Sequence, residues 1–257
     1  LAVREPFQMW GIQGGESLAE KLPFVKAGLP GVFVTPDVTP YKKRKVRILN
    51  GAHTAFVPGS WVAGFDIVRD CMHDETVRGF MNTMLYDEVI PTLAADLDVE
   101  DCKAFAAAVE NRFDNPFIDH ALLSICLNST AKWRARDLPT LKDYVAETGN
   151  LPKCLATSLA TLISFYTQEL VSREGDGLHL RRSDGTEYTA QDDAFVLDFY
   201  AAHAGADDAQ LVHDVLTNEQ MWGEDLTQIA GLEDFVVSAL AVVRADGAKQ
   251  AFANAQA

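Results

Sequence analysis

The sequence lacks an apolar run long enough to cross a membrane. A transmembrane helix needs about 18 consecutive apolar residues. The most apolar run, residues 155–165, is interrupted by Thr157, Ser158, Thr161 and Ser164. The N-terminus also shows no basic segment followed by an apolar one, the pattern of a secretory signal. We therefore expect a cytoplasmic protein with no membrane partner.

Cysteine is scarce, and its spacing fits neither a disulfide framework nor a zinc site. A disulfide framework shows many cysteines in a short chain, and a zinc site shows C-x-x-C pairs. The sequence has none, so it predicts reduced thiols in the core and no metal. The widely spaced cysteines are Cys71, Cys102, Cys126 and Cys154.

Basic residues are outnumbered, with 22 Lys and Arg against 37 Asp and Glu and a formal net charge of −15. Nucleic-acid binding needs a basic face that neutralises phosphates, so we predict no nucleic-acid partner. An anionic substrate would need a local group of cations to overcome the repulsion of the whole protein. The 257 residues, 48% of them hydrophobic, are enough for one large or two small domains with a sizeable core.

The composition of the chain changes after its first forty residues, which are rich in proline and glycine. Prolines exclude long helices there, and β-prone runs predict short strands at residues 7–12 and 32–38. From Lys45 onward, apolar residues recur with helical periodicity. The turn signal at residues 183–185 predicts a hairpin within residues 175–188. We predict a mainly α, multi-helical fold with a short β-containing N-terminal strip and one small β-hairpin.

Helix boundaries follow from the apolar spacing and from capping signals. Thr189, followed by Asp192 and Asp193, predicts a helix N-terminus, because acidic groups stabilise the positive end of a helix. The alanine-rich tail after Gly247 is expected to fray. The predicted helices span residues 66–93, 100–111, 119–128, 138–148, 153–173, 190–203, 206–216 and 232–243.

The segment from Lys45 to Thr54 carries three side chains suited to carbonyl chemistry. On an α-helix, Asn50 would lie about 140° and His53 about 80° around the axis from Lys45, on one side. An amine exchanges a proton, a carboxamide donates to a polarised oxygen, and an imidazole holds a hydroxyl. Spacing alone favours two alternatives over a catalytic role. Residues 42–45 would then be a solvated basic patch, and His53 would be packed in the core.

The frame Lys45-Val-Arg-Ile-Leu-Asn50-Gly-Ala-His53 resembles the K-x4-N-x2-H signature of the polyol-specific long-chain dehydrogenases. This is the family of mannitol dehydrogenases and hexuronate reductases. Further matches follow the family's order over about the first 140 residues. They are Glu5-Pro6-Phe7 with Trp10, the R-F-x-N-P motif within Asn111–Pro116, Leu127-Asn128-Ser129 with Lys132, and Leu138-Pro139.

Two details separate this chain from the mannitol-type members. The interval from Trp10 to Lys45 is short, and residues 47–54 are most similar to the hexuronate-reducing branch, which interconverts tagaturonate and altronate. Mannitol-type members read W-V-x-E-D where this chain has Trp10-Gly-Ile-Gln-Gly14. No role of that acidic residue is therefore carried over.

The resemblance implies an NAD-dependent reductase of hexuronate catabolism that needs no metal. Lys45 would be the general acid/base that protonates the substrate oxygen as hydride arrives at the ketone carbon. Asn50 would donate a hydrogen bond to that oxygen, and His53 would orient a neighbouring hydroxyl.

A uronate substrate also implies side chains that bind its carboxylate. Arg112 is the strongest candidate, because a guanidinium binds a carboxylate through two parallel hydrogen bonds. His120 and Lys132 are weaker candidates. The alternatives are that Lys132 is a surface residue and that Arg112 pairs with Glu110 or Asp114.

The resemblance also implies a domain that the sequence does not contain. Residues 1–40 would be the remnant of the connection to a missing N-terminal Rossmann domain, and residues 41–257 the helical substrate and catalytic domain. Residues 11–15 do not match the dinucleotide fingerprint G-x-G-x-x-G, and we expect no βαβ unit after them. NAD would be bound mainly by the protein's own Rossmann domain. The other expected partner is a small sugar acid, and the chain alone should be inactive.

Other functions stay open from the sequence. Fructuronate reductase and mannitol or polyol 2-dehydrogenase are near alternatives within the family. A non-catalytic helical binding module is an alternative of another class.

Overall fold

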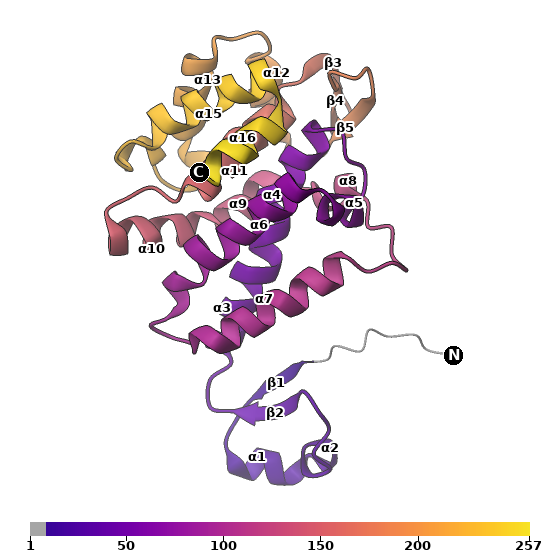
Figure 1. Cartoon of the computed structure of the whole chain (residues 1–257), viewed down its shortest axis with the longest axis vertical. Helices are drawn as coiled ribbons and strands as arrows, with labels where there is room; N and C mark the ends of the chain where they lie inside the picture. The colour runs from indigo at the N-terminus through magenta and orange to yellow at the C-terminus, as the bar shows by residue number, and fades with distance from the viewer. Residues whose placement is uncertain (1–8) are drawn as a thin grey trace. The chain divides into compact units, whose positions relative to one another are not determined.

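The computed structural model describes residues 9–257, and the contacts divide the chain into two compact units after Val46 (Figure 1). The mainly α prediction is confirmed. Two small sheets accompany the helices, one of two strands and one of three. The predicted motif at residues 5–7 and the start of the predicted strand at residue 7 lie outside the described residues.

The first unit contains two short parallel strands. Strand β1 (Trp10–Gln13) pairs with β2 (Val32–Thr35), and the short helices α1 (Glu16–Lys21) and α2 (Pro23–Lys26) connect them. Parallel neighbours require such a crossover, so this is a β-α-β unit. The expectation that none follows residues 11–15 is therefore wrong. Helices of six and four residues are too short to produce a readable apolar period.

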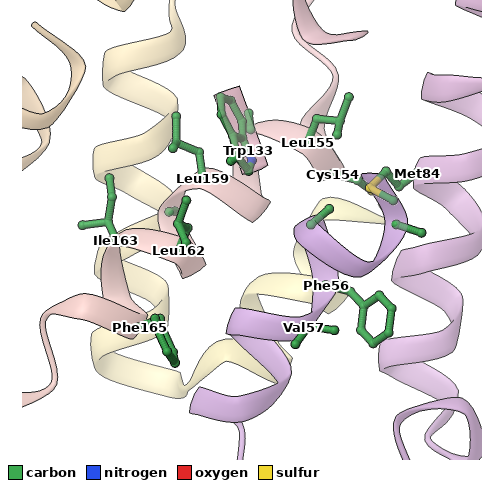
Figure 2. Packing of buried hydrophobic residues seen from close by; sticks show 14 of the residues in the cluster. Phe56, Val57, Met84, Trp133, Cys154, Leu155, Leu159, Leu162, Ile163 and Phe165 are labelled. Carbon is green, nitrogen blue, oxygen red and sulfur yellow. The ribbon is translucent and has the colours of Figure 1, made fainter. Parts of the chain in front are cut away.

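The second unit is organised around α11 (Lys153–Tyr166), which is buried along nearly its whole length. Helices α4 (Gly51–Val62) and α15 (Leu232–Asp246) both pack against it. Figure 2 shows the apolar side chains of α4 and α11 in this core. Each buried Leu or Phe contributes about 1.5–3 kcal/mol. This packing is the main source of the unit's stability.

Hydroxyl residues interrupt the apolar run of α11 without opening it to solvent. The Ser158 hydroxyl donates to the carbonyl of Leu155 at 2.6 Å, and the Thr161 hydroxyl donates to the carbonyl of Ser158 at 3.0 Å. A buried hydroxyl that is satisfied within its own helix costs little. The run is therefore core and not membrane, and no helix among residues 9–257 is long and apolar enough to cross a bilayer.

The other helical elements follow the predicted order, and α7 and α10 lie where the sequence places them. The four cysteines are buried and free, as predicted. The remaining helical elements are α3 (Thr39–Arg44), η1 (Lys45–Asn50), α5 (Val68–His73), α6 (Glu75–Thr83), η2 (Met84–Val89), η3 (Pro91–Leu93), α7 (Val99–Phe113), α8 (Leu122–Ile125), α9 (Ser129–Arg136), α10 (Leu138–Thr148), α12 (Ala194–Ala202), α13 (Asp208–Leu216), α14 (Glu219–Trp222), η4 (Leu226–Gln228) and α16 (Ala248–Ala255).

The prediction of a single helix over residues 66–93 is wrong. Asp74 breaks it by accepting hydrogen bonds from the backbone N–H groups of Thr76 and Val77, both at 3.1 Å, which begins α6. The apolar side chains on both sides of the break face the same core, so their spacing conceals it. The helix predicted over residues 119–128 is likewise reduced to the short α8.

A three-stranded antiparallel sheet replaces the end of the helix predicted over residues 153–173. It contains β3 (Glu169–Glu174), β4 (Gly177–Arg181) and β5 (Glu187–Ala190) in that order. The predicted hairpin is confirmed between β4 and β5, where Gly185 has a φ of +89°. The helix predicted from residue 190 begins later, at Ala194, because β5 continues to Ala190.

The C-terminal tail forms α16 instead of fraying. Its buried side chains include Phe252, which stacks on Phe80 of α6 with ring centroids 4.1 Å apart. The small alanines on the same face bring the helix close to the core. In an alanine-rich segment the buried and exposed positions differ little in hydrophobicity, so the sequence pattern does not reveal this packing.

Phe252→Ala should therefore destabilise the protein by about 3–5 kcal/mol, the cost of emptying a buried phenylalanine site. Urea denaturation measures the change in the free energy of unfolding. Gln250→Ala, at an exposed position of the same helix, is the control and should change it by less than about 0.5 kcal/mol. Equal stability of the two variants would show that the tail does not pack.

Candidate active site

The predicted catalytic segment begins with a π-helical turn. Element η1 (Lys45–Asn50) is π-helical, and α4 begins directly after it. A π-helix places more residues in each turn than an α-helix, so the α-helical angle predicted between Lys45 and Asn50 is wrong. The boundary between the units follows Val46, so Lys45 belongs to the first unit, and Asn50 and His53 belong to the second.

His53 packs among aromatic rings, and one of its ring nitrogens has no partner. The ring stacks on Phe113 with centroids 3.9 Å apart and meets His120 edge-on at 5.5 Å. The residue as a whole is half-buried, but its Nε2 atom is fully buried and has no hydrogen-bond partner among the described residues. A ligand hydroxyl would satisfy this nitrogen.

The surroundings of His53 keep its imidazole neutral. Burial lowers the pKa of His53 to about 3, and the nearby His120, Arg136, Arg112 and Lys132 lower it further in the same direction. A neutral imidazole both donates and accepts, which suits a group that orients a hydroxyl.

Two helices supply the positive charge around His53. Arg112 lies on α7, and Lys132 and Arg136 lie on α9. Each acts electrostatically on His53. The structure therefore brings together four residues that the sequence singled out, His53, Arg112, His120 and Lys132. Arg112, Lys132 and Arg136 form a cationic cluster around His53, in a protein whose net charge is −15.

Arg136 is a member of this cluster that the sequence reasoning missed. Its Nη1 donates to the Thr54 hydroxyl at 2.9 Å and to the carbonyl of Asn50 at 3.4 Å. Burial lowers the pKa of Arg136, and the adjacent Asp137 opposes that shift. The available signal was the four-residue spacing from Lys132, which places both side chains on one helix face.

The Lys132 side chain is half-buried and points towards a residue that precedes it in the chain. Its Nζ donates to the carbonyl of Ile125 at 2.9 Å. Burial lowers the pKa of Lys132, and Arg136 adds to that effect. Lys132 is therefore not an ordinary surface lysine.

The loop after α7 places His120 beside His53. Arg69 donates to the carbonyl of Pro116 at 3.0 Å and pairs with Asp119 at 2.5 Å. An isolated antiparallel bridge between Ile67 and Ala121 closes the loop. The R-F-x-N-P motif therefore ends in a loop that is anchored at several points.

The two carboxylates that flank Arg112 in sequence have partners of their own. Glu110 accepts hydrogen bonds from Arg78 at 3.3 Å and from the Tyr86 hydroxyl at 3.1 Å. Asp114 pairs with His73 at 2.7 Å.

A cavity of about 370 Å³ lies elsewhere in the second unit, and none of the predicted site residues lines it. Tyr200, His203 and Arg244 are among its lining residues. Among residues 9–257, no group of three or more His, Cys, Asp or Glu side chains is placed to hold a metal ion.

The fold and the segment around His53 define a class of protein. The chain belongs to the family of the mannitol dehydrogenase C-terminal domain, whose model matches residues 37–243.

Two relatives in this family are altronate oxidoreductases. The protein of Yersinia enterocolitica serotype O:8 is 39% identical over 98% of this chain and 50% of its own length. That of Pectobacterium carotovorum is 42% identical over 96% of this chain and 50% of its own length. The chain therefore spans about half the length of the curated relatives it matches.

Solved structures share the fold. Pseudomonas fluorescens mannitol 2-dehydrogenase, in a ternary complex with NAD and D-mannitol, has a TM-score of 0.74 at 22% identity, over 88% of this chain and 42% of its own. A substrate-free D-sorbitol dehydrogenase has a TM-score of 0.70 at 20% identity, over 90% of this chain and 43% of its own.

The low pKa of His53 predicts a loss of stability in acid. Folding lowers the pKa of His53 from 6.5 to about 3. As the pH falls, the unfolded chain therefore binds a proton at this histidine before the folded protein does. Protons therefore favour unfolding as the pH falls from about 6.5 towards 3, and the stability is intact above that window. Between pH 7.5 and 5, the native protein should lose roughly 2 kcal/mol more than His53→Gln, measured by urea denaturation.

His213→Gln is the matched control, because His213 is exposed. It should retain the acid sensitivity of the native protein. An equal acid response in native protein and His53→Gln would contradict the neutral, buried imidazole.

Proposed function

We propose that this chain is the substrate-side domain of an NAD-dependent reductase that interconverts tagaturonate and altronate without a metal. The observation that carries the proposal is the cationic cluster around His53, in a chain whose relatives are altronate oxidoreductases. Partly buried cations gathered at one place attract an anion even in an acidic protein, and a uronate carries a carboxylate.

Lys45, Asn50 and His53 carry the chemistry in this proposal. Reduction adds a hydride to the ketone carbon and a proton to its oxygen. A nicotinamide cofactor would supply the hydride when bound. The Lys45 ammonium gives the proton, is left as a neutral amine and regains its proton from solvent. Asn50 donates to the same oxygen, and the Nε2 of His53 bonds a neighbouring hydroxyl.

The substrate carboxylate is bound by the cluster in this proposal. Arg112 is its main partner, because a guanidinium forms two parallel hydrogen bonds with a carboxylate. His120 and Lys132 both act electrostatically on His53 and share its surroundings. Arg136 joins them as a fourth group.

The cofactor is held mainly outside this chain in the proposal. Within residues 9–257, the sheet of β1 and β2 has two strands, and its first turn does not have the G-x-G-x-x-G spacing that cradles a pyrophosphate. A Rossmann domain that precedes residues 1–40 would bind NAD, and residues 41–257 would form the catalytic domain. By itself this chain would turn over no substrate.

Lys45→Ala should lower the kcat of the full-length enzyme by about 10²–10⁴-fold, because the substrate oxygen loses its proton donor. NADH oxidation with tagaturonate measures the rate, and circular dichroism confirms that the variant folds. Lys42→Ala, in the same basic run, is the control and should retain activity. Retained activity in folded Lys45→Ala would refute the assignment.

Arg112→Gln should raise the KM for tagaturonate by roughly 10–100-fold, the value of a charge-assisted hydrogen-bond pair. The KM for fructose, which has no carboxylate, should change little. Steady-state kinetics of the full-length protein with tagaturonate, fructuronate and fructose measure both effects. Preference for fructuronate or fructose would favour the alternative activities, and no turnover of any of them would favour a non-catalytic module.

A further inference from the structure

Helix α9, which carries Lys132 and Arg136, has no N-cap of its own. Asn128, at the cap position, has a φ of +51°, and its side chain makes no capping hydrogen bond. It is the only residue other than glycine with a positive φ among residues 9–257. A left-handed, uncapped start costs free energy, so it persists only where the surroundings hold it.

A segment some sixty residues later provides the missing cap. The carboxylate of Asp192 accepts a hydrogen bond from the backbone N–H of Thr130 at 3.0 Å. The carbonyl of Gln191 accepts one from the N–H of Asn128 at 2.9 Å. A carboxylate at this position satisfies an N–H group and stabilises the positive end of the helix.

Asp192 is itself anchored to the central helix. The same carboxylate oxygen accepts a short hydrogen bond from the Tyr166 hydroxyl of α11, and the other accepts one from the N–H of Asp193 at 2.8 Å. The Tyr166 ring is buried and stacks on Tyr200 with centroids 4.7 Å apart and planes 6° apart. The first turn of α9 is therefore tied to α11 through one side chain.

We propose that Asp192 is a positioning residue for the substrate carboxylate: it sets α9 so that Lys132 and Arg136 face His53, and it places a negative charge near the Lys132 ammonium. This inference rests on the proposed function, because it assigns the two cations to an anionic substrate.

The charges around Lys132 support the second part of this role. Burial lowers the pKa of Lys132, followed by Arg136 on the same helix, whereas Cys126 at the end of α8 and Asp192 raise it. His53 of α4 is also coupled to Lys132 and stays neutral. Asp192 is thus the acidic residue that opposes the loss of the Lys132 proton.

Asp192→Asn should raise the KM of the full-length enzyme for tagaturonate by roughly three- to tenfold, the range for losing one hydrogen bond that orders a binding element. It should change kcat less. The rise of KM at high pH, where Lys132 loses its proton, should begin at a lower pH than in the native enzyme. Asp193→Asn, at the exposed neighbouring carboxylate, is the matched control and should behave as the native enzyme does.

Two further variants separate charge from placement. Tyr166→Phe keeps the carboxylate and removes one anchor, so KM should rise while its pH dependence stays in place. Asp192→Glu restores the charge, so it should restore the pH dependence. If Asp192→Asn raises KM without moving the pH dependence, or changes neither, the proposed role is wrong.

A measurement that does not use activity distinguishes this inference from the proposed function. Trace acetylation of lysines over a pH series, read by peptide mass spectrometry, follows the proton on Lys132 directly. Its midpoint should move to lower pH in Asp192→Asn and stay in place in Asp193→Asn. An unchanged midpoint refutes the inference even if the native enzyme reduces tagaturonate. A shifted midpoint in a protein that reduces no hexuronate refutes only the proposed function.

Discussion

The burial of α11 between α4 and α15 is the constraint on which the rest of the structure depends. Helix α4 carries His53 at one end and packs its apolar side chains on α11 along its length. Helix α9, with Lys132 and Arg136, is tied to α11 through Tyr166 and Asp192. The parts of the site on α4 and α9 therefore share one support, and a loss of packing along α11 would disturb both of them.

Charge is distributed unevenly in this protein for a physical reason. A net charge of −15 repels anions at long range, but screening confines that repulsion to about 10 Å in ordinary salt. Partly buried cations on α7 and α9 are screened much less. Their desolvation appears in the lowered pKa values of Lys132 and Arg136. Burial lowers the pKa of His53, and repulsion by these cations lowers it further. An anionic ligand would relieve that repulsion.

The polar groups that shape the cluster are distant in sequence. Asp192 caps α9 across sixty-two positions, and Arg136 reaches Thr54 across eighty-two. In the sequence, Asp192 and Asp193 together indicate the start of the following helix. The structure separates their roles, because β5 continues to Ala190 and turns the Asp192 carboxylate back towards Thr130. Local capping rules describe the right chemistry here but assign it to the wrong helix.

The sequence by itself determined the helical class, the hairpin at residues 183–185, the K-x4-N-x2-H frame and three of the cations or imidazoles that surround His53. These features depend on local periodicity, turn chemistry and motif spacing, which a single chain displays directly. Tertiary structure alone decided the break at Asp74, the packed tail at Phe252 and the place of Arg136 beside Thr54. Those outcomes depend on contacts between distant residues, and no local pattern carries the free energy of such contacts.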